Sequence, residues 1–70
     1  MTSDELHTRF TYHPPKGDQP VRYQRIREHG KALAELVDVE CPESREKSLA
    51  LTKIEEAIFW ANAAIARREP

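Results

Sequence analysis

The stretch LTKIEEAIFWANAAIAR, residues 51–67, carries the pattern that decides the fold. Apolar side chains recur in it at spacings of three and four, the period of an α-helix with one apolar stripe. A neighbouring row gives the same helix a second apolar face. Two such faces predict that the helix packs against a partner in its own chain and against another subunit. The stripe consists of Leu51, Ile54, Ile58, Ala61 and Ile65, and the second row of Thr52, Phe59, Ala63 and Ala66.

A partner helix is expected earlier in the chain. It should begin near Asp18, a good N-cap, with Pro20 tolerated in its first turn. Gly30 lies within its apolar stripe, where it weakens the helix by about 1 kcal/mol relative to Ala. Such a glycine suggests close approach of another backbone or of a ligand. The other stripe residues are Tyr23, Ile26, Leu33 and Val37.

The segment DVECP, residues 38–42, breaks this period and predicts the turn, with Pro42 in the first turn of the second helix. The fold predicted is all-α: a two-helix antiparallel hairpin at residues 18–70, preceded by an N-terminal arm at residues 1–17, within one domain. In the arm we expect a short helical turn from Ser3 to His7, capped by Ser3, and then an extended path at Pro14–Pro15.

The composition of the 70-residue chain limits how it can be stabilised. So short a chain buries only about 60% of its unfolded surface. Its single cysteine, Cys41, cannot close a disulfide within the chain, and one cysteine with three histidines makes a poor zinc set. We therefore expect no metal and no cofactor, and self-association as the stabilising device. No apolar run could span a bilayer and no signal peptide is recognisable, so a cytosolic protein is the default.

The charge is unevenly distributed although the net charge is only −1. Residues 9–31 hold six cationic side chains against two carboxylates, and residues 32–70 hold five against eight. A cationic zone in a nearly neutral protein favours a small anionic ligand over a long nucleic acid, which usually requires a larger basic excess.

Catalysis is disfavoured by the motifs. The sequence has no Gly-x-Ser-x-Gly, phosphate-loop or HExxH pattern. Glu55 and Glu56 point in different directions on a helix, and the acidic surroundings of Cys41 do not favour a thiolate. We expect no catalytic residue.

The segment TYHPPKGDQPVRYQRIREHGK, residues 11–31, holds the candidate ligand contacts. Tyr12 and His13 are planar groups next to a stiff Pro–Pro unit, suited to stacking on nucleobases. Lys16 precedes a helix N-terminus, where anions are favoured, and Arg27 and Lys31 lie on one flank of that helix. Plainer interpretations compete with a nucleotide pocket. From the residues alone, the nucleotide pocket is the less favoured interpretation.

In these plainer interpretations Tyr12 packs the arm onto the hairpin, Tyr23 belongs to the core and the arginines form a solvated face. Trp60 fits a subunit interface better than a stacking platform. Asn62, set among alanines, could make either an interchain hydrogen bond or a ligand contact.

The segments at residues 12–37 and 41–67 together resemble the small phage nucleotide-sponge family that counters CBASS and Thoeris immunity. The likeness rests on Tyr12–His13–Pro14–Pro15, Gln19, Tyr23, Ile26–Arg27, Lys31 and the closing run from Asn62 to Arg67. The resemblance implies a non-enzymatic protein that binds cyclic nucleotide signals and sequesters them without cleavage. It also implies a helical hairpin assembled as a homo-oligomer, for which we expect a hexamer, with pockets between protomers.

The resemblance also implies ligand contacts. Tyr12 is the candidate for base stacking, His13 and Pro14 for the pocket wall, and Tyr23 belongs to the matching motif. Phosphate contacts are expected from Lys16, Arg27 and Lys31, and a second anion site from symmetric copies of Arg67.

The expected ligands are cyclic dinucleotides, with cyclic trinucleotides as further candidates, in the cytoplasm of an infected bacterial host. Neither a membrane nor a long nucleic acid is expected as a partner. Two alternatives stay open: a sponge for the cyclic ADP-ribose isomers of Thoeris, and a small helical adaptor that binds a protein partner. Some members of the family carry an additional β domain, for which this chain has no room; that favours cyclic oligonucleotides.

Overall fold

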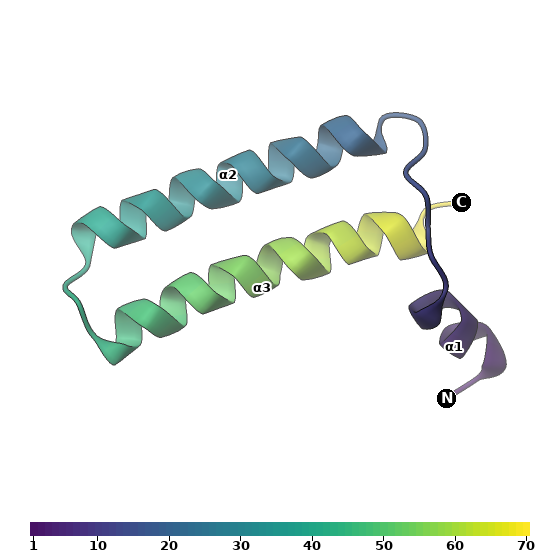
Figure 1. Ribbon diagram of the computed structural model, residues 1–70, viewed down its shortest axis with the longest axis horizontal. Helices are drawn as coiled ribbons and strands as arrows, with labels where there is room; N and C mark the ends of the chain where they lie inside the picture. Colours follow the sequence, from purple (N-terminus) through teal and green to yellow (C-terminus); the bar gives the residue numbers. More distant parts are fainter.

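The computed structural model describes all 70 residues, and every regular element in it is helical. Helix α1 covers Ser3–Phe10, α2 covers Gln19–Glu40 and α3 covers Arg45–Arg68. Helices α2 and α3 lie side by side and run in opposite directions, and α1 lies at the end of the hairpin where α3 finishes (Figure 1). The all-α helical hairpin predicted from the sequence is confirmed.

The N-terminal helix is longer than predicted and starts differently. It extends to Phe10 rather than ending near His7. Its cap is Thr2, not Ser3, because the Thr2 Oγ1 accepts a hydrogen bond from the Glu5 amide at 3.1 Å. The Thr2 hydroxyl thereby satisfies one unpaired N–H group of the first turn, and the N-cap lies one residue earlier than expected.

The start of α3 also corrects the sequence-based expectation. The sequence pattern predicts Pro42 in the first helical turn, but this residue lies in the connection between α2 and α3. Ser44 is the N-cap, and its Oγ accepts a hydrogen bond from the Lys47 amide at 3.1 Å. The helix begins after the residue whose hydroxyl can satisfy a free N–H group, which proline cannot do.

At the start of α2, Asp18 occupies the predicted N-cap position but makes no side-chain cap. Its carboxylate lies 3.6 Å from the Arg22 Nη1 instead. The neighbouring Gln19, only 4% exposed, accepts a hydrogen bond from the Lys16 amide at 3.1 Å and donates one to Glu69 Oε1 at 3.0 Å. Gln19 thus ties the beginning of α2 to the segment that follows α3.

The closed end of the hairpin is held by a buried lysine. The Lys47 side chain is 6% exposed, and its Nζ donates to the Asp38 backbone carbonyl at 2.8 Å. The same ammonium pairs with the Asp38 carboxylate at 3.1 Å and with Glu43. The hydrogen bond to Glu43, followed by the one to Asp38, raises the pKa of Lys47. A cation at the C-terminal end of α2 also suits the helix dipole there.

Close packing between α2 and α3 centres on Gly30. A Cβ at this position would lie 2.2 Å from the Ile58 Cδ1 and 2.7 Å from its Cγ1. The close approach expected at Gly30 is therefore real, but the group that fills the space is a side chain of α3 rather than a backbone or a ligand. All five residues of the α3 stripe are at least partly buried, whereas Leu33 of the α2 stripe is 49% exposed.

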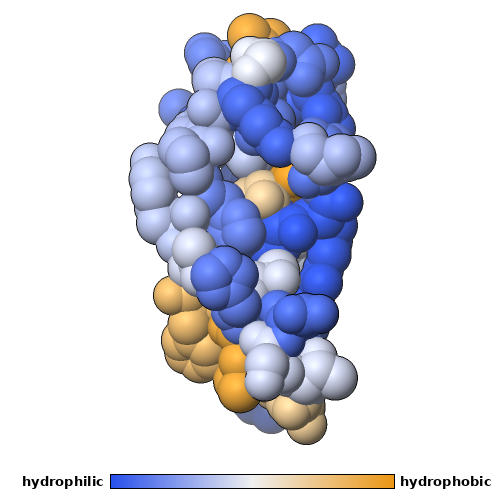
Figure 2. All heavy atoms as spheres, turned by 90° about the vertical axis from the view of Figure 1, so that its right-hand side faces the viewer, coloured by the Kyte–Doolittle hydropathy of each residue, from blue (hydrophilic) through white to orange (hydrophobic).

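The isolated chain has no hydrophobic core. No apolar residue is buried, and the only two buried residues are Gln19 and Lys47. The accessible surface of 5638 Å² exceeds the roughly 4,500 Å² typical of a folded monomer of 8.1 kDa. The radius of gyration of 15.2 Å likewise exceeds the roughly 11 Å of a compact 70-residue domain. Seen from the end that carries α1, the surface is largely hydrophilic, with hydrophobic side chains in small patches (Figure 2).

Candidate functional site

A hollow of about 340 Å³ lies between α2 and α3 towards the open end of the hairpin. We call it the α2–α3 hollow. Residues four apart on α2 and three or four apart on α3 share one helix face, so the sequence spacing places their side chains on one surface. The lining residues are Tyr23 and Arg27 from α2, with Phe59, Asn62, Ala63, Ala66 and Arg67 from α3.

Two guanidinium groups flank this hollow without a partner. Neither Arg27 nor Arg67 makes an ion pair or a side-chain hydrogen bond. Only Arg25 and Arg45 share this condition, and they lie elsewhere on the hairpin. Every other cationic side chain is engaged within the chain, with carboxylates or, for Lys16, with the Pro70 carbonyl. The hollow therefore holds positive charge that the chain itself does not neutralise.

Aromatic rings stand beside these cations. Tyr23 is half-buried on the α2 side, and Phe59 is 58% exposed on the α3 side. The Phe59 ring also meets Trp60 edge to face, with ring centroids 5.0 Å apart and planes at 83°. This contact restrains the Phe59 ring while leaving more than half of the residue accessible. The hollow thus combines surfaces for stacking with groups for anions.

A second hollow, of about 490 Å³, adjoins the first along the hairpin. Arg27 belongs to both, and Lys31 lines only the second. Lys31 is weakly engaged, with its Nζ 4.0 Å from Glu35 and a side chain that is 78% exposed. Glu55 on the α3 side gives this second hollow a carboxylate that the α2–α3 hollow lacks.

The structure brings some of the predicted contact residues together and separates others. Tyr23, Arg27 and Arg67 meet in the α2–α3 hollow, and Arg27 and Lys31 meet in its neighbour. The other four predicted residues, Tyr12, His13, Pro14 and Lys16, line neither hollow.

These four residues lie in the extended segment between α1 and α2. Tyr12 is 79% exposed. The His13 Nε2 lies 2.7 Å from the Thr8 carbonyl, to which it donates, and so the ring closes the end of α1. The Lys16 ammonium donates to the Pro70 carbonyl. Within one chain, His13 and Lys16 therefore hold local structure, and Tyr12 faces solvent.

The sequence pattern predicts Phe59 on a second apolar face and leaves the role of Asn62 open. Their common signal is position: Phe59 lies eight residues before Arg67 on the same helix face, and Asn62 lies three residues after Phe59. Asn62 has a further property that no sequence pattern shows. Its Oδ1 is buried and accepts no hydrogen bond.

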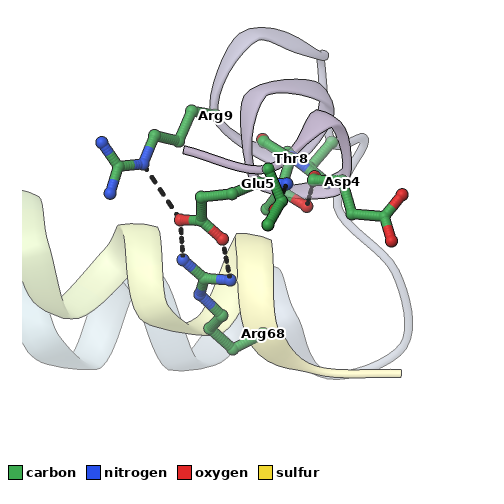
Figure 3. Close-up of polar contacts among 7 residues, drawn as sticks. Asp4, Glu5, Thr8, Arg9 and Arg68 are labelled. Atoms are coloured by element: carbon green, nitrogen blue, oxygen red, sulfur yellow. Dashed lines mark hydrogen bonds and ion pairs between the residues drawn. The ribbon is translucent and has the colours of Figure 1, made fainter.

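The N-terminal helix is docked on α3 by ion pairs that Figure 3 shows. Arg68 donates to both carboxylate oxygens of Glu5, at 2.7 and 3.1 Å, and Arg9 donates to Glu5 at 3.0 Å. These hydrogen bonds, first that of Arg68 and then that of Arg9, lower the pKa of Glu5 to about 2. A hollow between α1 and α3 includes Phe10 and Trp60 in its lining.

A matching pair anchors the segment after α3. Arg22 donates to the two carboxylate oxygens of Glu69 at 3.0 and 2.7 Å. This contact lowers the pKa of Glu69 and raises that of Arg22. Arg67 immediately precedes both tethering residues of this segment, Arg68 and Glu69, yet has no such partner.

The structure contains no cluster of three or more histidine, cysteine, aspartate or glutamate side chains that could hold a metal ion. None of the three helices combines the length and the apolar character that crossing a membrane requires.

A family model described as Acb2/Tad1, hairpin domain, matches residues 2–66. The chain belongs to this family. The Acb2/Tad1 family is that of the anti-CBASS and anti-Thoeris sponges, so the resemblance drawn from the sequence is confirmed. Membership supports a phage anti-defence role as a binding protein, in a family not known for enzymes. No curated protein and no solved structure matches the chain.

Proposed function

We propose that this Acb2/Tad1 protein binds the cyclic oligonucleotide second messengers of CBASS, cyclic dinucleotides first among them, and sequesters them without degrading them. The observation that carries the proposal is the pair of unpartnered guanidiniums, Arg27 and Arg67, beside the rings of Tyr23 and Phe59 in one hollow. Guanidinium groups suit phosphates, and aromatic faces suit nucleobases. Cyclic dinucleotides offer both groups at short range.

Sequestration requires tight binding, since a sponge competes with the effector that the signal would activate. A dissociation constant of tens of nanomolar corresponds to about 10 kcal/mol. Stacking at roughly 1–3 kcal/mol per base and charge-assisted hydrogen bonds at roughly 1.5–3 kcal/mol each can reach this value, provided that the ligand is largely enclosed. Because the hollow is open on one side, a further part of the protein must enclose the bound ligand.

Self-association supplies that enclosure in our proposal, and a hexamer is the assembly that we expect. Two observations support self-association. The chain lacks a buried apolar residue, and large apolar side chains such as Val39, Phe59 and Trp60 are more than half exposed. Tyr12 is then free to stack on a ligand held by another subunit, because its ring is 79% exposed and lines neither hollow of its own chain.

The remaining predicted contacts fall into two groups in this proposal. Lys31 extends the cationic lining beyond Arg27, and Lys16 reaches a ligand by exchanging its contact with the Pro70 carbonyl. His13 and Pro14 hold the backbone that follows Tyr12 in the direction that stacking needs. The protein acts on messengers in the cytoplasm of the infected bacterium, where the host synthesises them.

The test is calorimetric titration of the purified protein with 3′,3′-cyclic GMP-AMP, with the mass of the assembly measured by light scattering. We expect a dissociation constant of tens of nanomolar or lower, and unaltered ligand recovered by chromatography after denaturation. Cleaved ligand would contradict sequestration. If the cyclic dinucleotide gives no heat but cyclic ADP-ribose isomers bind, the protein is a sponge for Thoeris signals instead, and if neither class nor cyclic trinucleotides bind, the adaptor interpretation replaces ours.

A further inference from the structure

Asn62 holds the one buried side-chain nitrogen or oxygen atom of the chain that lacks a hydrogen-bond partner. The atom is its Oδ1, and no side-chain hydrogen bond of any kind involves the amide. Buried polar groups in native proteins are nearly always paired, since a buried carbonyl without a partner destabilises the folded state. The chain tolerates this cost at a single position, and that position lines the α2–α3 hollow.

No neighbouring side chain in sequence satisfies the Asn62 amide. Its immediate neighbours are Ala61 and Ala63, which carry no polar side-chain group. A rotation about the Cβ–Cγ bond exchanges Oδ1 and Nδ2, so either end of the amide can be turned towards the hollow with the rest of the side chain in place. Arg27 and Arg67, which flank it, are donors only.

We infer that Asn62 is a specificity-determining contact of the α2–α3 hollow, whose amide hydrogen-bonds the edge of a nucleobase while the two guanidiniums take phosphates. This inference rests on the proposed nucleotide-binding function. A base edge carries N–H donors next to carbonyl or ring-nitrogen acceptors, and an amide carries one group of each kind. A phosphate offers acceptors only and would leave the Asn62 carbonyl oxygen unpaired.

Asn62→Leu separates a ligand contact from a structural one. Leucine has a similar size and no polar atom, so it removes both the orphan carbonyl and the proposed hydrogen bond. We expect binding of 3′,3′-cyclic GMP-AMP to weaken about tenfold, as for the loss of one hydrogen bond. The Tm of the ligand-free protein should be unchanged or higher, because a destabilising group has gone. A residue kept for structure would show a lower Tm instead.

Two further variants keep the test decisive. Asn62→Ala should weaken binding by a similar factor, which guards against a steric effect of leucine in the hollow. Gln24→Leu is the matched control: Gln24 lies on the exposed side of α2, pairs with Glu28 at 3.0 Å, and should leave affinity within about twofold.

The outcomes distinguish the inference from the function on which it rests. Unchanged affinity in both Asn62 variants, with tight binding by the unmodified protein, would overturn the inference alone. A lower Tm with dissociation of the assembly would also overturn it, by placing the amide at a subunit contact. If the unmodified protein binds no cyclic nucleotide, the proposed function fails and the inference with it.

Discussion

The buried cation at the closed end of the hairpin is satisfied by the chain itself, whereas two of the cations towards the open end are not. At the closed end the Lys47 ammonium is buried and meets a backbone carbonyl and two carboxylates. Towards the open end the guanidiniums of Arg27 and Arg67 line a hollow and meet no acceptor of their own chain. The comparison teaches that net charge hides the relevant quantity, which is whether a cation is already satisfied. A satisfied cation holds the fold together, and an unsatisfied one is available to a ligand.

Neutralising the two unsatisfied guanidiniums should have the largest effect. In the double variant Arg27→Gln/Arg67→Gln, affinity for 3′,3′-cyclic GMP-AMP should fall at least a hundredfold, because two charge-assisted hydrogen bonds are worth roughly 3–6 kcal/mol together. The Tm should hardly change, since neither group has a partner to lose.

The matched control is Arg25→Gln/Arg45→Gln, which removes the other two unpaired arginines and the same total charge. Calorimetry should show affinity within about threefold of the unmodified protein. An equal loss in both double variants would mean that the ligand responds to overall charge and not to this hollow.

Filling the contact at Gly30 should destabilise the hairpin between its two ends. Gly30→Val introduces side-chain atoms where a Cβ alone would lie 2.2 Å from Ile58, so we expect a loss of about 2 kcal/mol in the free energy of unfolding. Chemical denaturation of Gly30→Val and of the control Ala32→Val, at an exposed position on α2, measures the difference. Because valine is a better helix former than glycine, a loss in Gly30→Val no larger than that in Ala32→Val would contradict a close contact with Ile58.

Removing the satisfied cation should affect stability and not binding. Lys47→Met deletes the contacts at the end of α2, and we expect the Tm to fall by about 5 °C or more while affinity stays within about twofold. Lys53→Met is the control, because the Lys53–Glu56 pair is largely exposed and such pairs contribute little. If Lys47→Met abolished binding in a folded assembly, the contrast between the two ends would break down.

The smallest expected effect is the release of α1 in acid. The pKa of Glu5 is lowered from 4.5 to about 2 by Arg68 and Arg9, so docking of α1 is fully supported above about pH 4.5. The support is lost progressively as the pH falls from there to about 2. Because Trp60 and Phe10 line one hollow, Trp60 fluorescence should report undocking in this range. Glu5→Gln should remove the transition, and its persistence there would assign it to another group.

The helical hairpin was predictable because its signals are local. Spacings of three and four placed Ile54 and Ile58 on the face that meets α2, and the break in the apolar period after residue 37 predicted the turn. Details at the helix ends were not predictable to the residue. Whether Thr2 or Ser3 caps α1, and whether Pro42 precedes or enters α3, depends on small differences in hydrogen bonding.

The candidate site was predictable only in its chemistry. The sequence offered eleven cations and could not show which of them are paired, because the pairing joins residues far apart, such as Arg22 with Glu69 and Arg68 with Glu5. Likewise, the planar ring of Tyr12 and the family resemblance both indicated a stacking role, but the path of the arm takes that ring away from the hollow of its own chain. The resemblance identified the family, but only the structure shows how the candidate contact residues are arranged.

Nuclear magnetic resonance of the arginine Nε–Hε groups, recorded during titration with 3′,3′-cyclic GMP-AMP, tests the central claim most directly. We predict that the signals of Arg27 and Arg67 shift and saturate with the ligand, while those of Arg25 and Arg45 stay in place. Saturable binding accompanied by shifts at Arg25 or Arg45, with Arg27 and Arg67 unmoved, would contradict the assignment of the ligand to the α2–α3 hollow.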